Sequence, residues 1–170
     1  MLKIFGFVMV MLGSFGFSLL SVKRLSERIT ALQSMLEALN YLECELDFSM
    51  DAMPQILFNT ASRASGSVAA FFEFCGRELR DNAEREFSHI WRQAVEERMN
   101  ALHHSDIVEL LALGHVLGRF DAEHQKKSIA VVCNNLQKCL DSAKEEKSRQ
   151  GKVYGVVGVT VGFCLTIILL

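Results

Sequence analysis

The sequence predicts an all-α protein in which a bundle of about six helices lies between two transmembrane helices. Apolar residues recur every three or four positions through the middle of the chain, which is the period of an amphipathic helix. There is no Asn-Gly or Asp-Gly hairpin turn and no sustained alternation that would predict a strand. Each end of the chain is a long uncharged run. Half of the 170 residues are hydrophobic and one is proline, which excludes a disordered or collagen-like chain.

The first uncharged run covers Ile4–Val22, a length of 19 residues. As a helix it spans roughly 28 Å, close to the ~30 Å hydrocarbon core of a bilayer. We therefore expect an N-terminal transmembrane anchor over residues 1–22. The alternative is a signal peptide cleaved near Gly16-Phe17-Ser18, which has the small-x-small pattern of a cleavage site. The length of the run, and the basic residues that follow it instead of preceding it, favour an anchor that is not removed.

The second uncharged run covers Val153–Leu170, a length of 18 residues, and predicts a C-terminal transmembrane helix over residues 153–170. Glycines recur in and just before this run at steps of four, three and four. Such a stripe lets two helices approach closely in lipid, where packing drives association. The alternative is the ordinary glycine enrichment of membrane helices. The candidate helix-packing residues are Gly151, Gly155, Gly158 and Gly162.

The middle domain, residues 23–152, carries 17 basic and 20 acidic residues. This balance lacks the basic excess of a nucleic-acid binder. Four basic residues shortly precede the C-terminal run: Lys144, Lys147, Arg149 and Lys152. No basic residue follows the run. The positive-inside rule then places the middle domain in the cytoplasm and both termini across the membrane.

Five cysteines are present, an odd number with no C-x-x-C motif: Cys44, Cys75, Cys133, Cys139 and Cys164. A cytoplasmic domain keeps its thiols reduced, so we expect these to be free.

The first helix of the middle domain continues almost directly from the N-terminal anchor and is about 27 residues long by its apolar period. Its apolar face consists of Leu25, Ile29, Leu32, Leu36, Leu39, Leu42, Leu46 and Met50. Pro54 suits the first turn of a second helix, where its missing N–H has no partner to lose. This helix is expected to end near Ser65-Gly66. Ser67 is the expected cap of a third helix, and a fourth helix holds Phe87, Trp91, Val95 and Met99.

Ser105 is the expected N-cap of a fifth helix that ends at Leu117. Gly118 supplies a helix stop and Asp121 caps the sixth helix at once. The apolar face of this last helix consists of Ile129, Val132, Leu136, Leu140 and Ala143.

No motif predicts an enzyme, because the sequence has no glycine-rich phosphate loop, no H-E-x-x-H and no G-x-S-x-G. The best metal candidate is a bundle site built from two pairs, Glu86 with His89 and Asp121 with His124, at a spacing found in di-iron proteins. Acidic residues also favour helix starts because of the helix dipole, which explains Glu86 and Asp121 without a metal. We expect no cofactor. A helical-bundle metalloprotein and an acidic adaptor or sensor domain that binds a basic partner are the two alternatives.

Several strings spread over the whole chain resemble one bacterial family, stage III sporulation protein AB. Their order is more specific than any one of them. They are Arg24-Leu25-Ser26-Glu27-Arg28, the stretch Ala38 to Leu46, Pro54-Gln55-Ile56-Leu57, Leu117-Gly118-Arg119-Phe120-Asp121 with Gln125-Lys126, and the glycine-rich tail.

The resemblance implies a membrane-anchored platform subunit of the channel complex that joins the mother cell and the forespore during endospore formation. It implies a location in the mother-cell membrane around the forespore, with a helical domain similar to that of the type II secretion platform protein. The implied partners are the lipid bilayer, other membrane subunits and the cytoplasmic ATPase stage III sporulation protein AA. No catalytic residues come with the family. Arg119 and Phe120, at the junction of the last two helices, are the candidate partner contact, because Arg and aromatic residues anchor many interfaces. Junction packing is the alternative role.

Overall fold

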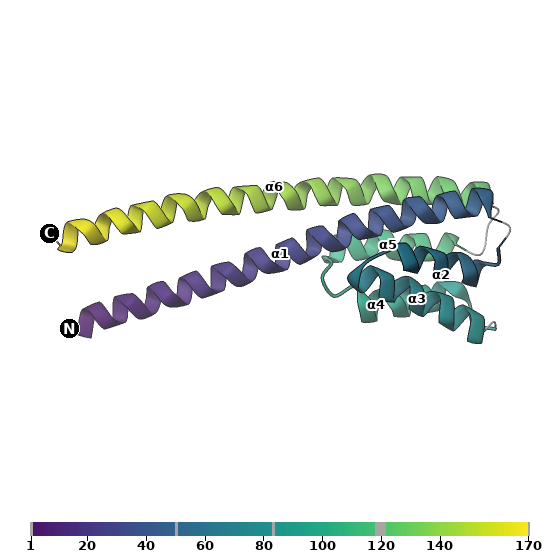
Figure 1. Cartoon of the computed structure of the whole chain (residues 1–170), viewed down its shortest axis with the longest axis horizontal. Helices are drawn as coiled ribbons and strands as arrows, with labels where there is room; N and C mark the ends of the chain where they lie inside the picture. The colour runs from purple at the N-terminus through teal and green to yellow at the C-terminus, as the bar shows by residue number, and fades with distance from the viewer. Residues whose placement is uncertain (1, 50, 83, 118–121, 170) are drawn as a thin grey trace. The chain divides into compact units, whose positions relative to one another are not determined.

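In the residues that it describes, the computed structural model has six α-helices (Figure 1). Its backbone is described over residues 2–49, 51–82, 84–117 and 122–169, and its side chains over 22–49, 51–82, 84–117 and 123–150. Within these ranges there is no strand, which confirms the predicted all-α class and the number of helices. The helices are α1 (Leu2–Phe48), α2 (Met53–Arg63), α3 (Gly66–Asp81), α4 (Phe87–Arg98), α5 (His104–Val116) and α6 (Ala122–Leu169).

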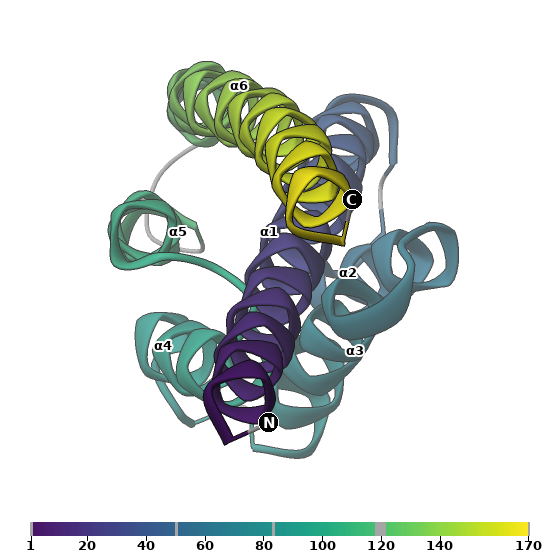
Figure 2. The same ribbon diagram turned by 90° about the vertical axis from the view of Figure 1, so that its left-hand side faces the viewer.

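The chain divides into two compact units. We call residues 28–141 the bundle, and residues 1–27 together with 142–170 the terminal unit. The terminal unit contains the first part of α1 and the last part of α6, and these two helix segments run antiparallel (Figures 1 and 2). The Lys147 ammonium on α6 donates a hydrogen bond to the Ser26 hydroxyl on α1 at 3.0 Å.

In the part of the chain whose side chains are described, no helix has a segment that is long and apolar enough to cross a membrane. The two uncharged runs, apart from Val22, lie outside that part. So does the predicted glycine stripe, which consists of Gly151, Gly155, Gly158 and Gly162.

The core of the bundle is apolar and lies between consecutive helices. α2 packs on α3, α3 on α4, and α4 on α5. Within the bundle, the predicted face of α1 is buried from Ile29 to Leu42, and the predicted face of α6 is buried from Ile129 to Leu140. Burial of these side chains, each worth roughly 1.5–3 kcal/mol of transfer free energy, is what holds the helices together.

An aromatic cluster fills the space between α3, α4 and α5. The Trp91 ring lies edge-on to Phe71, with ring centroids 4.7 Å apart, and Phe72 packs against both. The indole N–H donates to the Leu110 carbonyl at 2.7 Å, so its one polar group is satisfied. Gly114 lies directly against this ring, because a Cβ built there would be 2.2 Å from Trp91 Cδ1. Only a glycine lets α5 approach the indole this closely.

The structure corrects two predicted helix starts. α3 begins at Gly66 with Ser65 as its N-cap, so the prediction of Ser67 as the cap is wrong. The Ser34 hydroxyl accepts a hydrogen bond from the Ser65 amide at 3.1 Å, and Gly66 has a φ of +58° that favours glycine. Because of these two features, α3 begins earlier in the sequence than the prediction of a cap at Ser67 implied.

The other correction concerns α5, whose N-cap is His103 and not Ser105. The Asp106 carboxylate accepts the His103 amide at 3.0 Å, which forms a capping box at this helix start. Pro54 lies in the first turn of α2, as predicted. The predicted stop at Gly118 and cap at Asp121 lie outside the described residues.

Candidate functional site

A buried ion pair joins α1 to α5 in the bundle. Arg28 Nε donates to Asp106 Oδ2, and Arg28 Nη2 donates to Asp106 Oδ1, each at 2.8 Å. The side chains are 8% and 0% exposed. The Asp106 carboxylate also accepts from the His103 amide at 3.0 Å and the Ser105 hydroxyl at 3.2 Å. Both carboxylate oxygens are therefore committed to hydrogen bonds.

Burial raises the pKa of Asp106, but the hydrogen bonds from Arg28 and from the His103 amide outweigh it, so the net pKa lies below its ordinary value. The Cys139 thiol on α6 also donates to this carboxylate. Burial, followed by that hydrogen bond, raises the pKa of Cys139. A carboxylate held ionised by this many donors does not exchange protons near neutral pH. The arrangement fixes α1, α5 and α6 to one another and does not suit acid–base catalysis.

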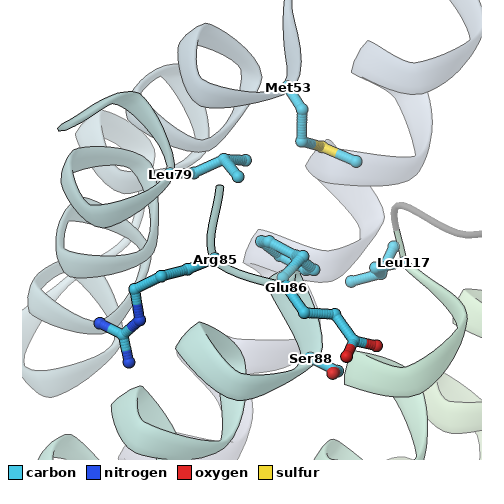
Figure 3. Close-up of a pocket in the computed structure, with 7 residues that line it drawn as sticks. Met53, Leu79, Arg85, Glu86, Ser88 and Leu117 are labelled. Atoms are coloured by element: carbon cyan, nitrogen blue, oxygen red, sulfur yellow. The ribbon is translucent and has the colours of Figure 1, made fainter. Parts of the chain in front are cut away.

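A surface hollow of about 350 Å³ lies where the ends of several helices meet (Figure 3). We call it the corner hollow. Met53 comes from the start of α2, Leu79 from the last turn of α3, and Leu117 follows α5. The remaining lining residues belong to the α3–α4 connection and the first turn of α4: Arg85, Glu86, Phe87 and Ser88.

The edge of the corner hollow carries both signs of charge. In Figure 3 the side chains of Arg85 and Glu86 leave the α3–α4 connection in opposite directions. Arg85 donates to Glu78 at 2.8 Å and to Gln93 at 3.1 Å, which fixes its guanidinium beside the opening. An apolar floor with a polar edge is the usual anatomy of a protein contact.

The sequence candidates for partner contact, Arg119 and Phe120, lie outside the described residues. Leu117, two residues before Arg119, is 1% exposed and lines the corner hollow. Sequence reasoning missed the hollow itself. The only indication of the hollow in the sequence is the pair Met53 and Leu79. Each is an apolar residue near the end of a helix, where a side chain does not have to be apolar.

The structure brings together one of the two predicted pairs of metal ligands, Glu86 with His89. His89 Nε2 lies 3.8 Å from Glu86 Oε2, and both side chains are largely exposed at the start of α4. His124 is exposed on α6, and Asp121 lies outside the described residues. Among the residues with described side chains, no group of three or more His, Cys, Asp or Glu side chains could hold a metal ion. Glu86 is the N-cap residue of α4, the kind of position that the helix-dipole explanation expected.

Comparisons with known proteins give one family. The model of the family described as "Stage III sporulation protein AB" matches residues 3–170. A solved structure titled "Stage III sporulation protein AB (SpoIIIAB)" superimposes with a TM-score of 0.66 at 21% sequence identity. The match covers 72% of this chain and 98% of that chain, and at this identity it shows the fold alone. No curated protein matches the sequence.

Proposed function

The chain belongs to the stage III sporulation protein AB family, and from this premise we propose that it is a membrane-anchored structural subunit of the channel complex between mother cell and forespore. The observation that carries the proposal is the family match over residues 3–170, which includes both uncharged runs. A role in sporulation follows from the family. The platform role, the membrane anchors and the partners are our proposal.

The sequence and backbone of the terminal unit support two anchors. The uncharged run Ile4–Val22 lies within α1, and the second run lies within α6 as far as Leu169, where α6 ends. Exposed basic side chains lie next to them, including Lys23, Arg24 and Arg149. Such residues are retained on the cytoplasmic side of a membrane. We therefore place the bundle in the cytoplasm of the mother cell, at the membrane around the forespore.

The chemistry of the bundle supports a structural role and not an enzymatic one. Arg28 and Asp106 saturate each other with hydrogen bonds. The thiol of Cys75 is 0% exposed, and burial raises its pKa far above the ordinary value, which leaves it without nucleophilic character.

We assign the corner hollow to the contact with the cytoplasmic ATPase, stage III sporulation protein AA. The hollow combines apolar side chains with a charged edge, and Leu117 connects it in sequence to Arg119 and Phe120. The arrangement suits a partner that inserts an apolar side chain and places polar groups at the edge.

The first experiment tests the topology with a membrane-impermeant thiol reagent. Cys44 is an exposed free cysteine on α1, so it reports on the bundle without denaturant. We expect labelling of Cys44 only after lysis of the cells, and a Cys44→Ser variant identifies its signal. Labelling in intact cells would show that the topology is the reverse of the proposed one, with the bundle outside the cytoplasm. The bundle could then not contact a cytoplasmic ATPase.

A further inference from the structure

A second surface feature of the bundle is a groove of about 390 Å³ between α5 and α6, which we call the α5–α6 groove. Its floor contains Leu113 and Val132, which are 1% and 4% exposed. Ala112 and Val131 are exposed to solvent at its sides. The groove is therefore an apolar surface with one buried layer beneath it.

Exposed apolar side chains also gather on this face. Among the described residues, three large hydrophobic side chains are exposed, and two of them, Val108 and Val131, lie here, whereas Phe48 does not. Val131 is 60% exposed and lines the groove. Val108 is 48% exposed and lies one helical turn from Ala112, on the same side of α5. Exposed apolar side chains that gather on one face mark an interaction surface more often than scattered ones.

Opposite charges lie on the two sides of Val131 along the groove. Lys127, Val131 and Asn135 follow one another at intervals of four residues on α6, so they form one stripe with steps of about 6 Å. Asn135 Nδ2 donates to Glu109 Oε2 at 2.9 Å, which holds the Glu109 carboxylate at the level of Asn135. A cation thus lies one step before Val131, and a carboxylate lies one step after it.

We propose that the α5–α6 groove binds the same groove of a second copy of this chain, with a two-fold axis close to Val131. A two-fold interface is isologous, so each end of the patch meets the opposite end of its partner. Lys127 of one copy then faces Glu109 of the other, twice, while the two Val131 side chains meet near the axis. The patch is complementary to itself in charge, as an isologous interface requires.

The remaining charges at the groove are compatible with this arrangement. Lys127 Nζ lies 3.4 Å from Glu123 Oε1 in an i, i+4 pair, with both side chains more than 70% exposed. Such exposed pairs contribute little, so Lys127 can exchange this partner for one that is desolvated in an interface. His124 lies at the same end as Lys127 and adds no opposing charge.

The test uses the full chain in detergent micelles and measures its self-association by sedimentation at 0.1 M salt. Lys127→Glu and Glu109→Lys should each weaken the dimer at least tenfold, because each places like charges across the axis. An equimolar mixture of the two variants should recover association. In the mixed dimer, the two substituted side chains face each other across the axis, and the native Lys127 of one copy faces the native Glu109 of the other. Both pairs are then of opposite charge again. Recovery cannot arise from misfolded single variants.

Lys138→Glu is the matched control, because Lys138 is exposed on α6 and does not line the groove. It should leave association unchanged. A wild-type chain that stays monomeric at about 100 µM, a concentration far above the Kd of a stable homodimer, would overturn the proposal. Association that Lys127→Glu leaves unchanged would also overturn it, since contact through the anchors or another partner surface does not depend on this residue.

A disulfide experiment locates the axis independently. In a chain that carries Cys44→Ser and Cys164→Ser, Val131→Cys should form an intermolecular disulfide on mild oxidation, and Ala130→Cys should form at least tenfold less. Adding Lys127→Glu should abolish the Val131→Cys product. Burial raises the pKa of the neighbouring Cys133 to about 11, so its thiol contributes little background. Equal crosslinking at positions 130 and 131 would contradict an axis at Val131.

Discussion

The Arg28 guanidinium and the Asp106 carboxylate, 78 residues apart in sequence, form a bidentate ion pair in the bundle, with both N–O distances at 2.8 Å. The pair connects α1 to the first turn of α5, and Arg28 is the residue at which the bundle begins on α1. Because both side chains are almost fully buried, each needs the other to satisfy its charge.

Removing either partner of this pair is expected to destabilise the bundle strongly. Asp106→Ala and Arg28→Ala should each lower the free energy of unfolding by about 3–5 kcal/mol, because an unpaired charge remains buried. The double variant should lose less free energy of unfolding than the two single variants lose together. Chemical denaturation measures these values. Lys23→Ala, which removes an exposed pair with Glu27, is the control and should change stability by less than about 1 kcal/mol. Equal effects of the buried and exposed substitutions would contradict the structural role of the pair.

The same pair predicts a dependence of stability on acid pH. The pKa of Asp106 lies below its ordinary value of 3.8 in the folded bundle, so the unfolded chain binds this proton more readily. The stabilisation is complete above the ordinary pKa and is lost as the pH falls through the folded pKa. Between pH 5 and pH 2, the free energy of unfolding should therefore fall more steeply for the wild type than for Asp106→Asn. Parallel pH curves for the two proteins would show that Asp106 is not the group that titrates.

A side chain at Gly114 should damage the aromatic cluster. Gly114→Ala places a Cβ 2.2 Å from Trp91 Cδ1, and overpacking of this kind costs about 1–3 kcal/mol. Alanine is the better helix former by about 1 kcal/mol, so a net loss shows that the clash outweighs the helix propensity. Gly76→Ala is the matched comparison, because its Cβ would lie 3.2 Å from the Pro54 carbonyl oxygen and 3.3 Å from the Phe58 ring. The Tm should fall further for Gly114→Ala than for Gly76→Ala, and the reverse order would contradict the close approach.

The corner hollow predicts a selective loss of partner binding. Leu79→Arg places a long charged side chain at the hollow, and we expect at least tenfold less ATPase subunit to co-purify with the full chain. Leu79 is half-buried, so the Tm must be measured alongside binding. Glu96→Arg, at an exposed position of α4 outside the hollow, is the control for added positive charge. If a folded Leu79→Arg protein binds the ATPase subunit normally, the corner hollow is not the contact.

The helices could be predicted from the sequence because the information is local. Each apolar face repeats at three or four residues, and Pro54 identifies the start of α2 by its own chemistry. Leu46, which the periodicity placed on the buried face of α1, is only half-buried. A pattern within one helix does not say how far the neighbouring helices extend along it.

The polar contacts could not be predicted, because they join residues that are distant in sequence. Nothing near Arg28 indicates that its partner is Asp106. The capping box of α5 begins with His103, which lacks the Ser or Thr that usually reveals this motif. Gly114 resembled any helical glycine until the position of Trp91 was known. Asp106 offered one weak signal, because it is an acidic residue in the first turn of a mostly apolar helix.

Trp91 is the only tryptophan of the chain, and its surroundings make it an intrinsic fluorescent reporter. Its ring touches Phe71 and Phe72 on α3 and Phe87 on its own helix, and its N–H is bonded to Leu110 on α5. Its emission therefore follows the docking of three helices without an added label. Circular dichroism sums the signal of all six helices. The difference between the midpoints of the two unfolding curves measures how tightly the melting of the bundle core is coupled to the melting of the long helices α1 and α6.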